Sequence, residues 1–463
     1  MTLSDWRACF DLGNQCYARG DYPQALDHYL QALNLNQGSW EVRNNLAVLL
    51  KLLGERAVAE TCLREALALN PDYLDAWINL GNLYRGLQRY DEAHQCFDAA
   101  LTLAPRHAEL LSNLGLLFKE QGRLAEAIDS YRRATALADA PAEAFFNGAI
   151  ALIQSGDYRE GFRWYEQRWR MPRMQALRQP LDQAMPEWRG EPLAGKTLLV
   201  WHEQGLGDMI QMARYLPLWK AAHPGCRLAL RVDAPLVPLL TCLAGVDLLV
   251  SSQAALPPAD YHLSAMSFPF VWGTMPESIP SRAPYLTADA ALTQRWAARL
   301  GPKGQRPRLG VVWQSGDFGV GLGEIDRQSR SLPPEALAAL LDRIDADWLS
   351  LQVGGDALPP ALAARLIAPG AIGDFADTAA ILTQLDALIT VDTAAAHLGG
   401  ALGVPTVVLM RALGGNLFPA DGERMPWYAS MRLARQTRLF DWQPVIADLP
   451  RLLSQVCPLP GIG

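Results

Sequence analysis

Several familiar chemistries have no candidate residues in this sequence. The seven cysteines are scattered without a C-x-x-C pair, and none of the seven histidines has an H-x-x-x-H neighbour. Disulfide frameworks and metal sites need thiols or imidazoles that are clustered at such spacings. We therefore expect no disulfide scaffold, no bound metal and no metal-dependent chemistry.

The sequence also has no excess of positive charge and no long apolar run. Its formal net charge is −7, which argues against a general nucleic-acid or membrane-surface binder. No apolar segment approaches the roughly 18 residues of a membrane span. The first ten residues, MTLSDWRACF, lack a basic region followed by an apolar one. We expect a soluble, cytoplasmic protein that binds neither nucleic acid nor a bilayer.

An internal repeat fills the first third of the chain. A leucine followed by a small residue recurs every 34 residues, at Leu12, Leu46, Leu80 and Leu114. Further small and large positions keep the same step: Ala25, Ala59, Ala93 and Ala127, and then Tyr29, Leu63, Phe97 and Tyr131. This period is typical of tetratricopeptide repeats, in which each unit is a pair of antiparallel helices. Such arrays present a concave surface to peptides or partner proteins.

The turns between the helices of each pair are marked by glycine, with Gln88 as the exception. A fifth, degenerate unit ends near residue 170 and carries two additional tryptophans, Trp164 and Trp169, which we expect to dock onto the following segment. The sequence therefore predicts an array of about five units over residues 1–170.

After residue 170 the pattern changes to alternating strands and helices. Residues 171–193 contain four prolines and are predicted to be a loop-like linker. Strands are predicted at 197–201, 227–232, 246–250 and 261–263, with a helix at 209–222. A second series follows a polar hinge at 301–307, with strands at 309–313, 348–352, 371–372, 387–391 and 404–409. This alternation indicates two doubly wound, Rossmann-like lobes, 171–303 and 304–463, with a ligand cleft where the strand C-termini meet.

The segment 387–402 is the strongest candidate site. An apolar strand ends at Asp392 and Thr393, and a helix rich in alanine and glycine follows. The free N–H groups and the positive dipole end of a helix N-terminus suit a phosphate, and side chains as small as Ala394 let it approach. Alternatively, Asp392 or Thr393 is only an N-cap. His397 either faces a ligand or is satisfied beneath the sheet.

The turn after the first strand of the first lobe contains Gly205, Gly207 and Asp208. It begins like a dinucleotide fingerprint, but Ile210 stands where the third glycine is needed, which argues against a nicotinamide site. Asp208 is either a helix cap or a general base that faces the cleft.

The second lobe offers polar groups at two further positions. Gln314 and Ser315 follow its first strand and form either a phosphate contact or an ordinary turn. Arg327 and Arg330 precede the next helix and either clamp a diphosphate or are solvated. The D-x-D pattern at Asp345 precedes a strand and so lies away from the cleft, where we expect it to be solvated.

Several motifs together carry a family resemblance. They are EQGLGDMIQMARYLPL at 203–218, VVWQSG at 311–316, DRQSRSLP at 326–333, LSLQVGG at 349–355, ITVDTAAAHLGGALGVP at 389–405 and PWYASMRLARQ at 426–436. The second half resembles the heptosyltransferase-like glycosyltransferases of the GT-B fold. The whole chain is similar to bacterial proteins that fuse tetratricopeptide repeats to such a transferase, an arrangement similar to that of O-GlcNAc transferase.

The resemblance implies metal-independent, inverting transfer of a sugar from a nucleotide diphosphate. Asp208 matches the aspartate that takes the acceptor proton, and Gln204, Gly205 and Gly207 form the acceptor-side turn. The donor-binding positions it implies are Gln314, Ser315, Arg327, Arg330, Gln352, Asp392, Thr393, Ala394 and His397. Arg330 stands where heptosyltransferases carry a lysine, and Val353 where many repeat-fused relatives have a basic residue. The nucleobase and the sugar therefore stay open.

The acceptor separates the main hypotheses. In the first, the repeats present a protein acceptor, because a solenoid groove suits an extended peptide. In the second, the acceptor is a saccharide or a lipid-linked molecule, and the repeats serve docking or homo-oligomerisation. A third hypothesis is a catalytically degenerate scaffold, and a fourth is a sugar-nucleotide epimerase on the same two-lobe fold. For the transferases we expect closure of the two lobes about 301–307.

Overall fold

The computed structural model describes residues 5–280, 283–316, 328–412, 414–415 and 417–458. The chain divides into two compact units, Met1–Ala151 and Leu152–Gly463. The repeat pattern places the boundary at residue 170, whereas the contacts assign the second helix of the fifth repeat to the second unit.

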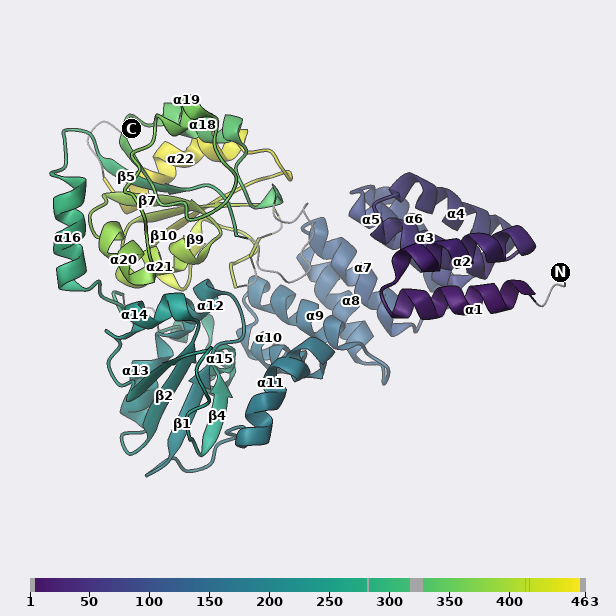
Figure 1. Cartoon of the computed structure of the whole chain (residues 1–463), viewed down its shortest axis with the longest axis horizontal. Helices are drawn as coiled ribbons and strands as arrows, with labels where there is room; N and C mark the ends of the chain where they lie inside the picture. Colours follow the sequence, from purple (N-terminus) through teal and green to yellow (C-terminus); the bar gives the residue numbers. More distant parts are fainter. Residues whose placement is uncertain (1–4, 281–282, 317–327, 413, 416, 459–463) are drawn as a thin grey trace. The chain divides into compact units, whose positions relative to one another are not determined.

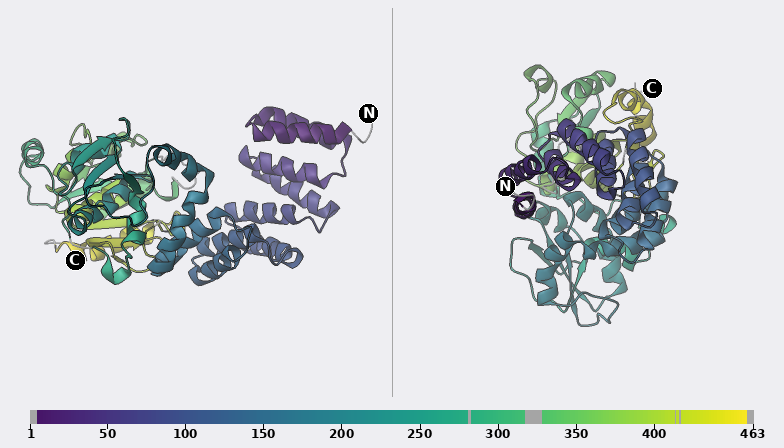
Figure 2. Two further views of the ribbon diagram at one scale, coloured as in Figure 1. Left: turned by 90° about the horizontal axis from the view of Figure 1, so that it is seen from below. Right: turned by 90° about the vertical axis from the view of Figure 1, so that its right-hand side faces the viewer.

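The first unit consists of antiparallel helix pairs (Figure 1). Its helices are α1 (Asp5–Ala18), α2 (Tyr22–Leu35), α3 (Trp40–Leu52), α4 (Arg56–Leu69), α5 (Leu74–Gly86), α6 (Tyr90–Leu103), α7 (Ala108–Glu120) and α8 (Leu124–Thr135), followed by α9 (Ala142–Ser155), which crosses into the second unit. The pairs stack in sequence order, as Figure 2 shows. Gly20, Gly54 and Gly122 have positive φ at the turns within the pairs, and Gln88 takes the same conformation at φ 59°. The helix pairs that the 34-residue period predicts are thus present.

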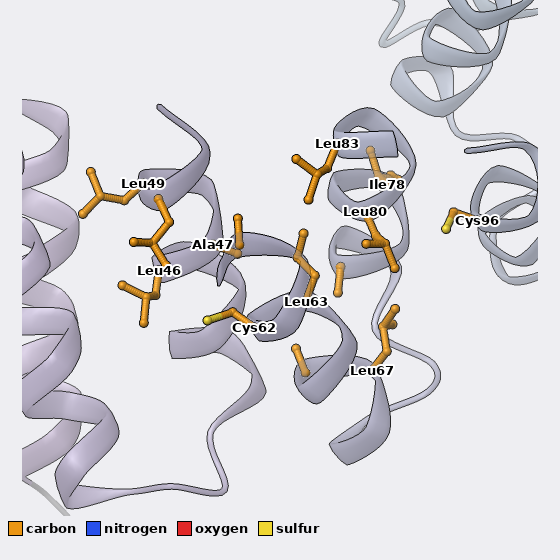
Figure 3. Packing of buried hydrophobic residues seen from close by; sticks show 14 of the residues in the cluster. Leu46, Ala47, Leu49, Cys62, Leu63, Leu67, Ile78, Leu80, Leu83 and Cys96 are labelled. Carbon is orange, nitrogen blue, oxygen red and sulfur yellow. The ribbon is translucent and has the colours of Figure 1, made fainter. Parts of the chain in front are cut away.

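Close contact within three of the pairs depends on a glycine that faces an aromatic ring, whereas the pair α3 and α4 has Ala47 and Leu63 at these positions. A Cβ atom built on Gly81 of α5 would lie 2.7 Å from Cδ1 of Phe97 in α6, and one built on Gly115 would lie 2.8 Å from Cε1 of Tyr131. Both rings are fully buried. Around these contacts, leucines such as Leu46, Leu63 and Leu80 from successive helices form one continuous apolar core (Figure 3). The recurring glycine and aromatic positions are therefore two halves of one packing contact.

We predict that Gly81→Ala lowers the free energy of unfolding by about 1–3 kcal/mol, because the added methyl group overlaps the buried ring of Phe97. Gly86→Ala in the same helix is the matched control, since no described atom lies within 4 Å of its Cβ position. It should be neutral or stabilising by up to about 1 kcal/mol. Chemical denaturation followed by far-ultraviolet circular dichroism measures both. Equal effects of the two substitutions would contradict the packing argument.

The second unit opens with α10 (Tyr158–Tyr165), a 3-10 helix, η1 (Glu166–Arg170), and α11 (Pro172–Ala184). The prediction of a loop over 171–193 is therefore wrong for its first half. Pro172 occupies the first turn of α11, where no backbone N–H is needed, so this proline starts a helix. The prediction that the tryptophans dock is confirmed for Trp169, whose ring lies 5.8 Å from that of Trp201.

Two separate sheets form the body of the second unit (Figure 1). The first contains the parallel strands β1 (Thr197–Trp201), β2 (Arg227–Val232), β3 (Leu248–Ser251) and β4 (Tyr261–Ser264), in the order β3-β2-β1-β4. The second contains β5 (Arg308–Val312), β6 (Asp347–Ser350), β7 (Ala387–Val391), β8 (Thr406–Met410), β9 (Arg424–Met425) and β10 (Tyr428–Arg435), in the order β6-β5-β7-β8-β10-β9. Only β9 pairs antiparallel among these described strands. Two mainly parallel sheets match the predicted alternation of strands and helices.

Short and medium helices connect these strands. Around the first sheet they are α12 (Leu206–Met212), α13 (Tyr215–Ala222), η2 (Ala234–Leu236), α14 (Val237–Leu240), η3 (Ala265–Ser267), α15 (Phe268–Val271) and η4 (Pro276–Ser278). The later ones are α16 (Ala290–Leu300), α18 (Pro334–Arg343), α19 (Pro360–Ala363), α20 (Phe375–Leu382), α21 (Ala394–Leu402) and α22 (Gln443–Val456). Trp296 of α16 donates to Asp377 of α20 at 2.8 Å, so α16 packs against a helix of the second lobe, whereas the boundary at 303 assigns it to the first. None of the described helices has the length and apolarity that a bilayer crossing requires.

Two further predictions are wrong in detail. The predicted helix 209–222 is broken between α12 and α13, where the Arg214 side chain donates to the carbonyl of Gln211 at 2.9 Å and to that of Trp427 at 2.7 Å. The described residues 371–372 form no strand, and β6 is instead flanked by a single bridge between Leu349 and Ile367. The first error involves a partner, Trp427, that is distant in the sequence.

Candidate active site

The two turns predicted to carry the chemistry lie against each other. The turn after β1 leads into α12, and the turn after β7 leads into α21. A Cβ atom built on Gly207 would lie 2.6 Å from Cδ2 of His397 and 3.2 Å from Cα of Ala394. Glycine is therefore required at position 207 for the first turns of the two helices to touch. This contact brings the predicted acceptor-side residues together with the predicted donor turn.

Asp208 is the third residue of α12, whose N-cap is Gly205, and its side chain takes part in capping the helix through the N–H of Gly205. Its Oδ2 accepts a hydrogen bond from the backbone N–H of Gly205 at 3.0 Å, which fixes the carboxyl group across the turn. The pKa of Asp208 is raised to about 7, chiefly by burial and then by the negative charges of Asp392 and Glu203, against the opposing effect of the Gly205 hydrogen bond. A carboxyl group with this pKa exchanges protons near neutral pH, as a general base requires.

The start of α21 does not have an ordinary N-cap. Thr393 is the N-cap residue, but its side chain makes no capping hydrogen bond within the described chain. Its hydroxyl lies 3.0 Å from that of Thr390 instead. Ala394, Ala395 and Ala396 then give the first turn of the helix small side chains. The interpretation of Thr393 as a simple cap is therefore not supported.

His397 is held in the neutral form beneath this turn. Its Nδ1 lies 3.1 Å from the hydroxyl of Tyr428. Its ring packs edge-on against that of Phe418, with 5.7 Å between the ring centroids. Burial lowers the pKa of His397 to about 3, assisted by the positive charge of Arg214. This histidine is satisfied by Tyr428 and packs directly against Gly207, so it supports the contact between the two turns.

The ends of β5 and β6 form a second group of predicted residues. The N–H of Gln314 donates to Oε1 of Gln352 at 3.0 Å, and Nε2 of Gln352 returns a bond to the carbonyl of Gln314 at 3.3 Å. These bonds show that Gln352 fixes the backbone at the end of β5. β5 pairs with β7, with Val312 opposite Thr390. Gln314 and Gln352 therefore lie at the same edge of the sheet as Asp392.

Ser315 and the arginines complete the predicted donor set. Ser315 is 4% exposed, and its Oγ has no hydrogen-bond partner in the described part of the chain, while its N–H donates to Ser331. Arg330 lies directly before Ser331, and Arg327 lies outside the described residues. A pocket of about 400 Å³ is lined by Gln314 and Ser331, which precede Ser315 and follow Arg330 in the sequence. Its lining includes Gln314, Gln328, Ser331, Leu332, Pro333, Pro334, Asp356, Phe440 and Trp442.

A buried ion-pair network supports the turn that carries Asp208. Arg168 of η1 is fully buried, and its Nε donates to Glu203 at 2.7 Å while its Nη1 donates to Glu166 at 2.7 Å. Its Nη2 donates to Ser267 at 2.9 Å. Removing one partner of such a buried pair costs about 3–5 kcal/mol, so Arg168 is a strong anchor for the segment that leads to Asp208. The sequence pattern did not identify Arg168, because only its burial distinguishes it from other arginines.

The sequence GEPLAGKT at Gly190–Thr197 matches the P-loop motif G-x-x-x-x-G-K-[ST]. A true P-loop follows a strand and opens a helix. Here Lys196 and Thr197 lead into β1, and the Lys196 ammonium pairs with Asp260 at 2.9 Å. This segment therefore lies at the opposite edge of the sheet from Asp208 and does not have P-loop structure. Among the described residues, no group of three or more histidines, cysteines or carboxylates is arranged to hold a metal.

We predict that Asp208→Asn stabilises the protein more at pH 8 than at pH 5. The pKa of Asp208 rises from 3.8 in the unfolded chain to about 7 in the fold, so its contribution to stability is complete below pH 4 and is lost as the pH rises through 7. Asparagine does not ionise and removes this loss. Thermal unfolding at both pH values, with the exposed Asp345→Asn as control, measures the difference. An equal effect of Asp208→Asn at pH 5 and pH 8 would contradict the buried-carboxyl assignment.

Comparison with known proteins identifies the repeats. Tetratricopeptide repeat family models match residues 13–54, 41–70 and 72–140. This part of the chain therefore consists of tetratricopeptide repeats, as its 34-residue period predicts. Protein FlbA of Caulobacter vibrioides is 26% identical over 329 residues, which cover 66% of this chain and 54% of FlbA. The similarity extends past the repeats, and the chain spans about half the length of this curated relative.

Several solved structures are similar to part of this chain. A thermophilic TPR protein of Thermus thermophilus is 26% identical, with 38% of this chain and 97% of that chain covered and a TM-score of 0.35. Pseudomonas aeruginosa pilF is 24% identical, with coverages of 36% and 75% and a TM-score of 0.34. The first TPR of Spaghetti (RPAP3), bound to an HSP90 peptide, is 25% identical, with coverages of 26% and 96% and a TM-score of 0.25.

Proposed function

We propose that the protein is a metal-independent glycosyltransferase that moves a sugar from a nucleotide diphosphate to a hydroxyl acceptor. The observation that carries this proposal is the contact between the Asp208 turn and the N-terminus of α21. Asp208, whose pKa is raised to about 7, provides a base on one side. A helix N-terminus with small side chains provides an anion site on the other. An inverting transfer needs both features within one site.

In the proposed reaction, the Asp208 carboxylate removes the proton from the acceptor hydroxyl. The acceptor oxygen forms a bond to the anomeric carbon of the donor, and the bond from that carbon to the diphosphate oxygen breaks. The electron pair leaves with the diphosphate, whose charge is stabilised by the N–H groups at the start of α21 and by nearby arginines. Positive charge from the protein performs the role that a divalent cation has in other transferases.

The arrangement of the two sheets supports a GT-B interpretation. In open α/β sheets, ligands bind outside the C-terminal ends of the strands. Asp208 follows β1 of the first sheet, and Asp392 follows β7 of the second, so both turns leave such an edge. In this proposal the first lobe carries the acceptor and the second lobe carries the nucleotide.

The repeats favour a protein acceptor. Tetratricopeptide arrays bind peptides or proteins on their concave surface, and here the array precedes the candidate transferase in one chain. Any shortened chain used to test this role must retain Arg168, because this residue anchors the segment before Asp208. A saccharide or lipid-linked acceptor and a non-catalytic scaffold are the competing functions.

We predict that the full chain releases nucleoside diphosphate from at least one member of a panel of nucleotide sugars, without added metal. Asp208→Asn should lower kcat/KM by roughly a hundredfold or more, because it removes the general base. Asp345→Asn is the control, since it removes an exposed carboxylate that pairs with Arg306. Coupled detection of the released diphosphate measures turnover.

The outcomes separate the competing functions. Transfer of labelled sugar to protein but not to saccharides supports a protein acceptor, and the reverse result supports the second hypothesis. If no member of the panel binds or turns over, the transferase proposal is wrong and a scaffold is favoured. If Asp208→Asn is as active as the wild type, the assignment of the base is wrong.

A further inference from the structure

The last residue of β10 is an arginine whose hydrogen-bonding capacity is largely unused. Nη2 of Arg435 donates to the carbonyl of Pro419 at 2.7 Å. Its Nε and Nη1 are buried and have no hydrogen-bond partner among the described residues. The described chain therefore covers these two N–H groups without accepting a hydrogen bond from either.

Such an arrangement is unfavourable without a ligand. A guanidinium group stays charged in proteins, so it cannot lower the free-energy cost of its burial by losing its proton. Leaving a charged donor buried and unpaired costs more than leaving a neutral one. Burial lowers the pKa of Arg435, while the negative charges of Asp421 and Asp392 act in the opposite direction. An anion that accepts from Nε and Nη1 would satisfy the group.

The unpartnered N–H groups of Arg435 lie at the same sheet edge as the turn that starts α21. β10 pairs with β8, with Arg435 opposite Met410, and β8 pairs with β7, so all three strands end at the same edge. A Cβ atom built on Gly414 would lie 3.1 Å from Nη1 of Arg435, and one built on Gly415 would lie 2.7 Å from Oδ2 of Asp392. Two consecutive glycines thus pass between the guanidinium and the residue that starts the turn.

A second buried polar group without a partner among the described residues lies at the same edge. Ser315, at the end of β5, is 4% exposed, and its Oγ has no partner within the described residues. β5 is the neighbour of β7 on the side away from β8. Polar groups without a partner therefore lie on both sides of β7 and β8: Ser315 lies in the segment after β5, and Arg435 lies at the end of β10.

We propose that Arg435 binds the diphosphate group of the nucleotide ligand, through N–H donors on Nε and Nη1, at the N-terminus of α21. The identification of the anion as part of a nucleotide rests on the proposed function, whereas the anion site itself rests on the unpaired guanidinium. The alternative is that Arg435 only clamps the segment that contains Pro419. In that case its replacement would reduce stability without changing anion binding.

The test compares binding of inorganic pyrophosphate to the full chain and its variants by isothermal titration calorimetry. Arg435→Gln should weaken pyrophosphate binding at least tenfold. Arg432→Gln is the matched control, because Arg432 lies on the same strand, three residues earlier, and bonds instead to Gln455 at 2.8 Å. It should change the affinity less than twofold. Arg435→Lys keeps the charge but has fewer donors, so it should give an intermediate affinity.

Three results would overturn the inference: no pyrophosphate binding by the wild type, unchanged affinity of Arg435→Gln, or an equal loss in Arg432→Gln. If Arg435→Gln does not fold, Arg435→Lys decides, and an affinity equal to the wild type overturns the inference. Nucleotide-sugar turnover by the wild type is measured in parallel. If the wild type turns over a nucleotide sugar but Arg435→Gln binds pyrophosphate as tightly as the wild type, only the inference about Arg435 is wrong. If pyrophosphate binding depends on Arg435 but no nucleotide sugar is turned over, only the proposed function is wrong.

Discussion

The packing of α12 against α21 is the contact on which the candidate site depends. Gly207 has no side chain, and this allows the first turn of α12 to meet Ala394 and His397 of α21. The contact places Asp208 close enough to Asp392 for one carboxylate to raise the pKa of the other. A base and an anion-binding helix end then lie within one site. Larger side chains at position 207 would separate the turns and remove this coupling.

Two buried arginines hold the segments that precede and follow α12. Arg168 anchors the segment before Asp208 through Glu203, and Arg214 connects the break after α12 to the carbonyl of Trp427 just before β10. β10 in turn provides Tyr428, which holds His397 under the α21 turn. The same strand ends at Arg435, beside that turn. Support for the turn and the proposed binding of the anion therefore come from the two ends of one strand.

The sequence predicted those parts of the fold whose causes are local or periodic. The repeat was readable because a small residue and a large apolar residue recur together where each helix pair packs, and the β7 turn was readable because an apolar strand ends in Asp392. The error in α11 arose because Pro172 reads as a loop residue, although it is tolerated in the first turn of a helix. Arg168 and Arg435 were not identified because burial comes from distant segments and has no local signature.

The central claim is that Asp208 and Asp392 are electrostatically coupled in one buried site. Carbon-13 NMR titration of the aspartate carboxyl groups tests it directly, with Asp208→Asn used to assign the resonance. The account predicts a pKa of about 7 for Asp208 in the wild type and a lower pKa in Asp392→Asn, because the substitution removes the neighbouring negative charge. A pKa for Asp208 near the ordinary value of 3.8, unchanged in Asp392→Asn, would contradict it.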